Sequence, residues 1–175
     1  MVHGEVTLTL RGIDHPLLYS GRADWELKEL LCGRDLLDML TCRTAEDFYL
    51  SWRAAGVLSR CHSVASRGLG EIPGPLLIPD EWIHVVTPEE TMTMAAAVAR
   101  AVKLGFAREH RKGPVDKGLA ALQKKRGEHT TYAQYLRCGI VNGLSPAQTL
   151  DLTPGVLYDL WELYLDATGR RKKED

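Results

Sequence analysis

The side chains best suited to chemistry are four cysteines and six histidines, and both sets are scattered along the 175 residues. They are Cys32, Cys42, Cys61, Cys138, His3, His15, His62, His84, His110 and His129. Cys61 and His62 are adjacent, and such a pair can serve as metal ligands or as a nucleophile with its base. Zinc sites need four convergent ligands, normally in closely spaced pairs, and a general base needs placed partners. Because neither CxxC nor HxxxH is present, we expect no metal site and no catalytic residue.

Motifs that bind phosphates or activate a nucleophile are also missing from the sequence. It contains no GxGxxG, GxxxxGK[ST], GxSxG or HExxH. The GxG at residues 68–70 is followed by prolines rather than by a helix start, so it does not predict a phosphate loop. We therefore expect a protein that is not an enzyme and carries no cofactor. An enzyme of an unrecognised family remains an alternative that no residue favours.

The cysteine spacing and hydropathy indicate a compartment. No CxxC pair, signal peptide or apolar run of membrane-spanning length is present. We expect free, mostly buried thiols in a reducing cytoplasm, and no membrane partner.

The elements that must position these side chains are mainly helical. Alternation over residues 5–10, a turn at 11–16 and apolar residues 17–19 predict a β-hairpin. The predicted helices cover residues 23–31, 34–40, 44–66, 88–109 and 130–138, with two further starts at Ser145-Pro146 and Thr153-Pro154. Thr87-Pro88-Glu89-Glu90 is the clearest start, because it combines an N-cap, a Pro at the first helical position and two carboxylates at the positive end of the helix dipole. We expect a mainly α protein of the α+β class, with an N-terminal β-hairpin packed on a helical domain and a small C-terminal helical appendage.

Helical periodicity predicts which positions face inward. These positions are Trp25, Leu27, Leu30, Leu31, Leu36, Leu37, Leu40, Phe48, Trp52, Ala55, Leu58, Cys61, Ala95, Val98, Ala99, Val102, Phe106, Tyr132, Tyr135, Leu136, Val156, Leu157, Leu160, Trp161 and Tyr164. Between the helices, residues 67–81 are rich in Gly and Pro and predict a long loop, with residues 76–78 extended. Residues 80–86 fit either a turn of helix or a strand.

Charge and composition divide the chain into three parts. The net charge is −1, yet residues 100–126 carry nine basic and two acidic side chains, a net charge of +7. We expect an N-terminal domain at residues 1–112, a basic linker at 113–129 and a small helical C-terminal domain at 130–175. The basic segment is either a solvated linker or a binding patch. The C-terminal domain is too small to be very stable alone, so it must dock on the first domain or on a partner.

Aromatic side chains on short helices are the candidates for binding a partner, because aromatic anchors dominate interfaces. The candidates are Trp82, Phe106, Tyr158, Trp161 and Tyr164. A DNA-reading helix-turn-helix is an alternative for the terminal helices. However, residues 154–166 carry three acidic side chains and no basic one, and such a surface repels phosphate. We therefore do not expect nucleic acid as a partner.

Two regions carry a resemblance to a known family. The first is GEVTLTLRG at residues 4–12, a predicted strand and turn, followed by a helix ending in LLCG at 30–33. The second runs from Tyr132 to Pro146 and continues in LTPG at 152–155 and LWE at 160–162. In these segments the chain resembles the tail assembly chaperones of long-tailed bacteriophages and prophages, in their extended or fused form.

The resemblance implies a protein of the host cytoplasm that binds the tape measure protein, keeps it soluble and recruits tail tube subunits. It also implies absence from the mature virion. In that family a programmed frameshift adds the second part, and the boundary expected here, at Gln123-Lys124-Lys125, has lysines that slippery codons can encode. Self-association is left open. The alternatives are another virion-morphogenesis part, such as a head–tail connector or adaptor, and a small DNA-associated regulatory protein.

Overall fold

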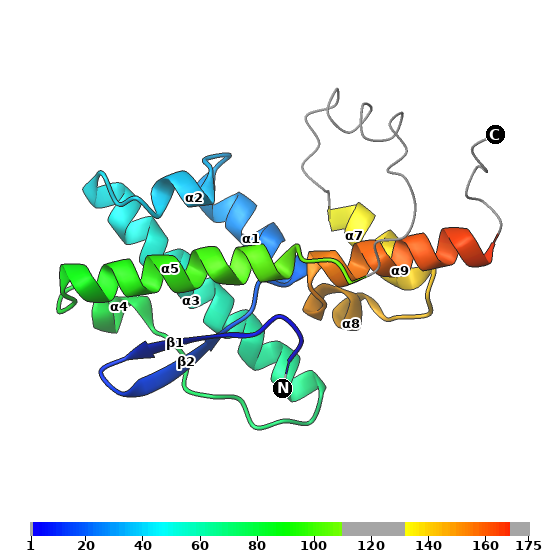
Figure 1. The fold of residues 1–175 in the computed structure, drawn as a ribbon, viewed down its shortest axis with the longest axis horizontal. Helices are drawn as coiled ribbons and strands as arrows, with labels where there is room; N and C mark the ends of the chain where they lie inside the picture. Colours follow the sequence, from blue (N-terminus) through cyan, green and yellow to red (C-terminus); the bar gives the residue numbers. More distant parts are fainter. Residues whose placement is uncertain (1, 110–131, 169–175) are drawn as a thin grey trace.

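The computed structural model describes residues 2–109 and 132–168. In these residues the fold is mainly α, with one two-stranded antiparallel sheet, which confirms the predicted class. The elements are β1 (Val6–Leu10), β2 (Ile13–Leu17), α1 (Gly21–Leu31), α2 (Leu36–Met39), α3 (Ala45–Gly68), α4 (Pro79–Trp82), α5 (Pro88–Gly105), α7 (Tyr132–Ile140), α8 (Pro146–Asp151) and α9 (Pro154–Ala167). Figure 1 shows α5 and α9 following one another along the long axis, with the hairpin below α5 and α1 and α2 above it.

The hairpin turns tightly at Arg11 and Gly12, which both have positive φ, at 50° and 79°. Positive φ at both central residues is the geometry whose twist matches two paired strands. The predicted turn at 11–16 was therefore too long, because β2 already begins at Ile13. Pro16 lies opposite Thr7 in this strand pair. A proline is tolerated there because both strands are edge strands.

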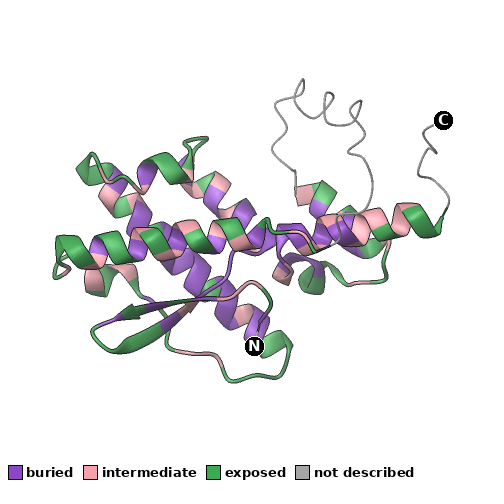
Figure 2. Cartoon of the chain, in the orientation of Figure 1, coloured by how far each residue is buried: buried purple, intermediate pink, exposed green. Residues whose placement is uncertain are grey.

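The hairpin is stabilised by the helices that it packs on. Val6, Leu8 and Leu10 of β1 are buried, whereas Thr7 and Thr9 between them are exposed. Figure 2 shows the buried residues gathered along α3 and the inner side of the hairpin and of α5. Their neighbours in the core include Leu17, Trp52, Leu58, Met94 and Val98. Each fully buried aliphatic side chain contributes about 1.5–3 kcal/mol, so a hairpin that is marginal by itself becomes part of a stable core.

Side-chain caps begin several helices where the sequence predicted them. Thr44 with Asp47 caps α3, and Thr87 with Glu90 caps α5, each in a reciprocal capping box. A third capping box, Ser145 with Gln148, begins α8. These pairs satisfy backbone N–H groups that have no partner inside the helix. The predicted cap at residue 130 lies outside the described residues.

Two predicted helix extents were wrong. The helix predicted over residues 34–40 is the four-residue α2. The helix predicted to reach residue 109 ends at Gly105. Beyond this glycine the chain turns toward the C-terminal helices, where the backbone N–H of Glu109 donates to Asp159 at 2.9 Å. The segment at residues 80–86, predicted to be a turn of helix or a strand, begins in the single helical turn α4 and continues as a turn.

Three side chains expected to face inward are instead exposed: Trp25 by 38%, Leu37 by 52% and Phe106 by 44%. The physical reason in α5 is that its buried face is rotated by about one residue. The buried positions of α5 are Thr91, Met94, Val98, Ala101 and Gly105. Of the residues predicted to face inward, only Val98 is among them, and the rest lie at the edge of the buried face. In α1 the buried face includes Leu27 and Leu31 but passes through Asp24 rather than Trp25. In α2 Met39 is the buried residue.

The C-terminal helices have a small core of their own. It consists of Tyr135, Cys138 and Leu157, with Leu152 and Trp161 packed against it. Its separation from the main core means that other contacts must attach α7, α8 and α9 to the remaining helices. The predicted domain boundaries at 112 and 130 border the undescribed segment and stay a prediction.

Candidate functional site

A buried carboxylate, Asp24 of α1, joins the two parts of the chain. Its side chain is 6% exposed. It accepts hydrogen bonds from Tyr19 Oη at 2.6 Å, from Tyr135 Oη at 2.8 Å and from Lys28 Nζ at 2.6 Å. A buried charge is costly unless it is paired and hydrogen-bonded, and here three donors satisfy it. Because Tyr135 belongs to α7, the C-terminal helices supply one of these donors.

The two phenols must remain neutral to act as donors. Burial and the Asp24 charge both raise the pKa of Tyr19, and the same two causes raise the pKa of Tyr135. Ionising either phenol would put a second negative charge beside a buried carboxylate. The arrangement is therefore a structural hydrogen-bond centre rather than an acid–base pair that works near neutral pH.

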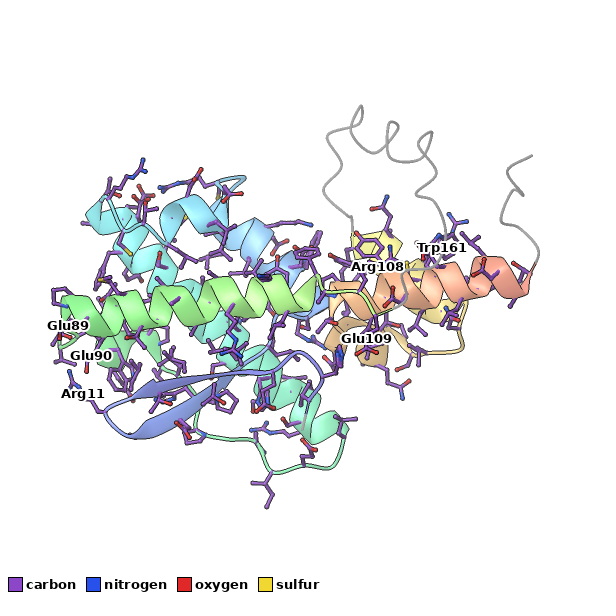
Figure 3. The ribbon with its side chains drawn as sticks, viewed as in Figure 1. Arg11, Glu89, Glu90, Arg108, Glu109 and Trp161 are labelled. Carbon is purple, nitrogen blue, oxygen red and sulfur yellow. The ribbon has the colours of Figure 1, made fainter. Side chains whose placement is uncertain are left out.

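Further polar contacts surround this centre. Arg22 forms an ion pair with Asp151 at 3.0 Å, and the backbone N–H of Gly21 donates to Leu152 at 2.8 Å. At the end of α5, Arg108 donates to Asp159 of α9 at 2.8 Å and lies 2.7 Å from Glu162. Figure 3 shows Arg108 and Glu109 at the place where α5 meets α9. We call the contacts of Gly21, Arg22, Asp24 and Arg108 with the C-terminal helices the junction. The sequence predicted that the C-terminal helices dock on the first domain or on a partner. In the structure they dock on the first domain.

Two glycines let backbones approach closely, Gly155 where α9 meets the end of α5 and Gly105 beside the junction. A Cβ built on Gly155 would lie 1.9 Å from the carbonyl oxygen of Ala107. A Cβ on Gly105 would lie 2.6 Å from the carbonyl oxygen of Tyr19. Both neighbours are backbone atoms, which cannot rotate away as a flexible side chain can. The junction therefore combines close backbone packing with polar contacts.

The predicted candidates Trp161 and Tyr164 lie together on α9. Their rings stack at 5.6 Å between centroids, and the Arg137 guanidinium lies over Trp161 at 5.0 Å. Ile140, one helical turn after Arg137, is 54% exposed. We call Arg137, Ile140, Trp161 and Tyr164 the distal patch. Figure 3 places Trp161 on α9 at the end of the molecule opposite Arg11. The patch combines two aromatic residues and an Arg, which are types enriched in protein interfaces, with an exposed aliphatic residue.

The other three candidates lie elsewhere. Tyr158 packs on Tyr135 at 6.5 Å, inside the C-terminal helices. Phe106 packs on Tyr19 at 5.4 Å beside the junction. Trp82 lies far from both, stacked on Trp52 at 6.4 Å. Of the five candidates, the structure therefore brings together Trp161 and Tyr164 as a shared surface.

Trp82 takes part in a clasp between the hairpin tip and α5. Arg11 lies over its ring at 5.3 Å and donates to Glu90 at 2.8 and 3.1 Å. Hydrogen bonds from Arg11 and from the Thr87 backbone lower the pKa of Glu90 to about 2. His15 meets Trp82 edge to face at 5.8 Å. Figure 3 shows Arg11 and Glu90 close together at one end of the molecule.

The adjacent Cys61 and His62 do not form a reactive pair. Cys61 is buried, and burial raises the pKa of its thiol to about 12, so it is not a thiolate at neutral pH. His62 Nε2 lies 2.9 Å from Glu5 instead. Cys138 is also buried, whereas Cys32 is exposed. Over residues 2–109 and 132–168, no group of three or more His, Cys, Asp or Glu side chains is placed to hold a metal ion.

Sequence reasoning missed Asp24, Arg22, Arg108 and Arg137. A signal for Asp24 was present, because it lies three residues before Leu27 and seven before Leu31, on the apolar face of one helix. A charged residue on such a face needs a partner. The partners of Arg22 and Arg108 are far away in the sequence, so no local pattern could have identified them.

Comparisons with known proteins give no match from protein-family models, from curated proteins or from solved structures. No helix in the part of the chain that the structure describes is long and apolar enough to cross a membrane. The fold is that of a mainly α protein with a small hairpin. Its function is inferred from its surfaces and from the resemblance of its sequence.

Proposed function

We propose that this chain is a tail assembly chaperone of the type found in long-tailed phages and prophages. In this proposal it acts in the host cytoplasm as a binding protein rather than an enzyme. It binds and solubilises the tape measure protein, recruits tail tube subunits during tail morphogenesis, and is absent from the finished virion. The observation that carries the proposal is the distal patch, an aromatic and arginine surface on a helical unit that is docked rather than loose.

The composition of the distal patch supports protein binding over other roles. Trp, Tyr and Arg dominate the energetics of protein interfaces, and the Arg137 side chain lies flat over Trp161. The same helix carries Asp159, Glu162 and Asp166 and no basic residue, which is unfavourable beside nucleic acid phosphates. The junction fixes α9 against α5, so a partner bound at the patch is carried rigidly by the whole protein.

The two separate hydrophobic cores also support a two-part function. One part, built on the hairpin and α1 to α5, has its own large core. The other has a separate small core and presents the distal patch. Two surfaces on one rigid body can hold two partners at once, as an assembly chaperone must. In the proposal the tape measure protein binds the first part and the tail tube subunit binds the second.

The proposal is tested by capture of the tail tube protein encoded in the same gene cluster. The tagged full chain is co-expressed with that protein, and the amount retained is compared for the wild type, Trp161→Ala and Ile140→Asp. Truncating a central aromatic anchor costs about 2 kcal/mol or more, so we expect each variant to lose at least about tenfold in capture. Met92→Ala, at an exposed site on α5, is the control and retains capture.

Ile140→Asp keeps Trp161 in place, so loss of capture by this variant separates a surface effect from a packing defect. Equal capture by the wild type and by both patch variants contradicts the proposed tube-binding role.

A further inference from the structure

A short segment before β1, residues 2–5, is packed into the body of the protein. Val2 is buried and lies in a small apolar cluster with Leu18 and with Ala65 of α3. Because this cluster removes apolar surface from water, it anchors the segment at its first described residue. We call residues 2–5 the strap.

Two contacts between a histidine and a glutamate fasten the strap to different elements. Glu5 Oε2 lies 2.9 Å from Nε2 of His62 on α3. His3 Nε2 lies 2.9 Å from Glu109 Oε1, at the place where α5 meets α9 (Figure 3). The strap therefore connects α3, in the main core, with the junction.

The middle of the strap presses on the start of α9. Gly4 has a φ of 81°, and a Cβ built on it would lie 2.9 Å from the methyl carbon of Thr153. The positive φ and the close approach both favour glycine at this position. Thr153 is the N-cap of α9 and is 2% exposed. The strap therefore covers this N-cap, with the methyl group of the threonine toward Gly4.

Thr153 does not cap its helix with its side chain. Its hydroxyl oxygen is buried and has no hydrogen-bond partner among the residues that the structure describes. By contrast, Ser20, Thr44, Thr87 and Ser145 each accept a hydrogen bond from a backbone N–H of the helix that they begin. A buried hydroxyl without a partner and an N-cap that makes no bond both cost free energy. The docked strap thus accompanies an unfavourable arrangement at the start of α9.

We propose that the strap is a latch with a docked and a released state, and that Thr153 changes its role between them. The methyl and the hydroxyl of threonine share one Cβ, so they turn together about χ1. When the strap leaves, the methyl loses its contact with Gly4. The hydroxyl is then free to accept from the backbone N–H of Gly155 or Val156, as an N-cap normally does. This new hydrogen bond offsets part of what the released strap gives up.

The latch regulates how rigidly α9 is held. The docked strap contacts the N-cap of α9 at Thr153 and the turn before it at Glu109, so its release removes two contacts beside the junction. The distal patch lies on α9 and moves with it. The latch needs no partner, so its test is independent of the chaperone role.

The test measures the thermal unfolding midpoint of the full chain for Thr153→Val in two backgrounds. Valine keeps the shape of threonine and removes the hydroxyl. With the strap docked the hydroxyl makes no bond, so Thr153→Val leaves the midpoint unchanged or raises it. In Gly4→Ala the added Cβ displaces the strap, and Thr153→Val then removes a cap and lowers the midpoint by about 2–4 °C. Thr87→Val, at an N-cap whose hydroxyl is bonded, is the control and lowers the midpoint in both backgrounds.

A second measurement follows the strap itself. NMR order parameters of the backbone amides at residues 3–5 should be near 0.85 in the wild type and below about 0.6 in Gly4→Ala. Val2→Asp releases the strap by another route, because it puts a charge beside Leu18 and Ala65. This variant takes the place of Gly4→Ala in the comparison if Gly4→Ala does not fold.

The remaining outcomes each overturn the latch. An equal fall in the midpoint for Thr153→Val in both backgrounds would mean that the hydroxyl caps α9 while the strap is docked. No fall in either background would mean that Thr153 does not change its role. Order parameters at residues 3–5 that keep the wild-type value in both Gly4→Ala and Val2→Asp would mean that the strap has no released state.

Discussion

Tyr135 Oη donates a 2.8 Å hydrogen bond to Asp24 Oδ2, a contact between residues 111 positions apart in the sequence. The same carboxylate accepts from Tyr19 and Lys28, so one buried charge is shared by the strand-to-helix connection, α1 and α7. Since the C-terminal helices have a separate small core, this hydrogen bond is a principal link between the two parts of the chain.

Replacing Tyr135 by Phe removes that donor and leaves the ring in place. We expect a loss of about 1.5–3 kcal/mol in the free energy of unfolding, the usual contribution of a hydrogen bond to a charged group. Urea denaturation measures it, and Tyr132→Phe on the same helix is the matched control. A double-mutant cycle with Asp24→Ala, which removes the acceptor, isolates the pair. A zero coupling energy in that cycle contradicts the role given to the contact.

The raised pKa values of Tyr19 and Tyr135 predict sensitivity to alkali. In the unfolded chain both phenols ionise near pH 10, whereas the folded state holds their protons to higher pH. The stability that they contribute is therefore complete below about pH 10 and is lost as pH rises above it. The unfolding free energy, measured from about pH 8 to 11, should stay level up to about pH 10 and fall above it, and it should fall less steeply for Tyr135→Phe. Ionisation of Tyr19 and Tyr135 with a midpoint near pH 10 in the folded protein, followed by tyrosinate absorbance, is the opposing result.

Gly155→Ala tests the fit of α9 against the end of α5. Its Cβ would meet the backbone of Ala107, so α9 must shift, and we expect a loss of about 1–3 kcal/mol from overpacking. Gly68→Ala is the control, since its Cβ would meet only one side-chain oxygen at 3.9 Å. The thermal unfolding midpoint of both variants is the measurement. A Gly155→Ala protein as stable as the control would mean that the close approach is not required.

The Arg11–Glu90 clasp predicts behaviour in acid. The pKa of Glu90 is lowered to about 2 from a usual value of 4.5. The clasp therefore contributes stability above about pH 4.5 and loses it as pH falls toward 2. In Arg11→Gln the Glu90 pKa should rise toward its usual value, which an NMR titration of the side-chain carboxyl reports. The same titration midpoint in Arg11→Gln and in the wild type would rule out Arg11 as the main cause.

Local patterns predicted much of the fold. The alternation of Val6, Leu8 and Leu10 predicted a strand, and Thr44 and Thr87 predicted helix starts, because each signal lies within a few residues. The turn was predicted less well, since Arg11 adopts a positive φ that non-glycine residues seldom take. The rotated face of α5 escaped prediction because Ala and Val occur on several of its sides, and only packing selects among them.

The candidate site was predicted only in part. Trp161 and Tyr164 are adjacent on one helix face, so their stacking follows from helical spacing. Arg137 reaches them from another helix, and Tyr135 reaches Asp24 from the far end of the chain. Such contacts depend on how helices dock, which residue spacing does not encode.

The most direct test of the chaperone account is co-expression of this chain with the long tape measure open reading frame from the same gene cluster. Solubility of the tape measure protein and its co-purification with the tagged chain are measured with and without the chain. The account predicts that the tape measure protein moves from the insoluble to the soluble fraction and elutes with the chain. A tape measure protein that stays insoluble while the chain purifies alone would contradict it.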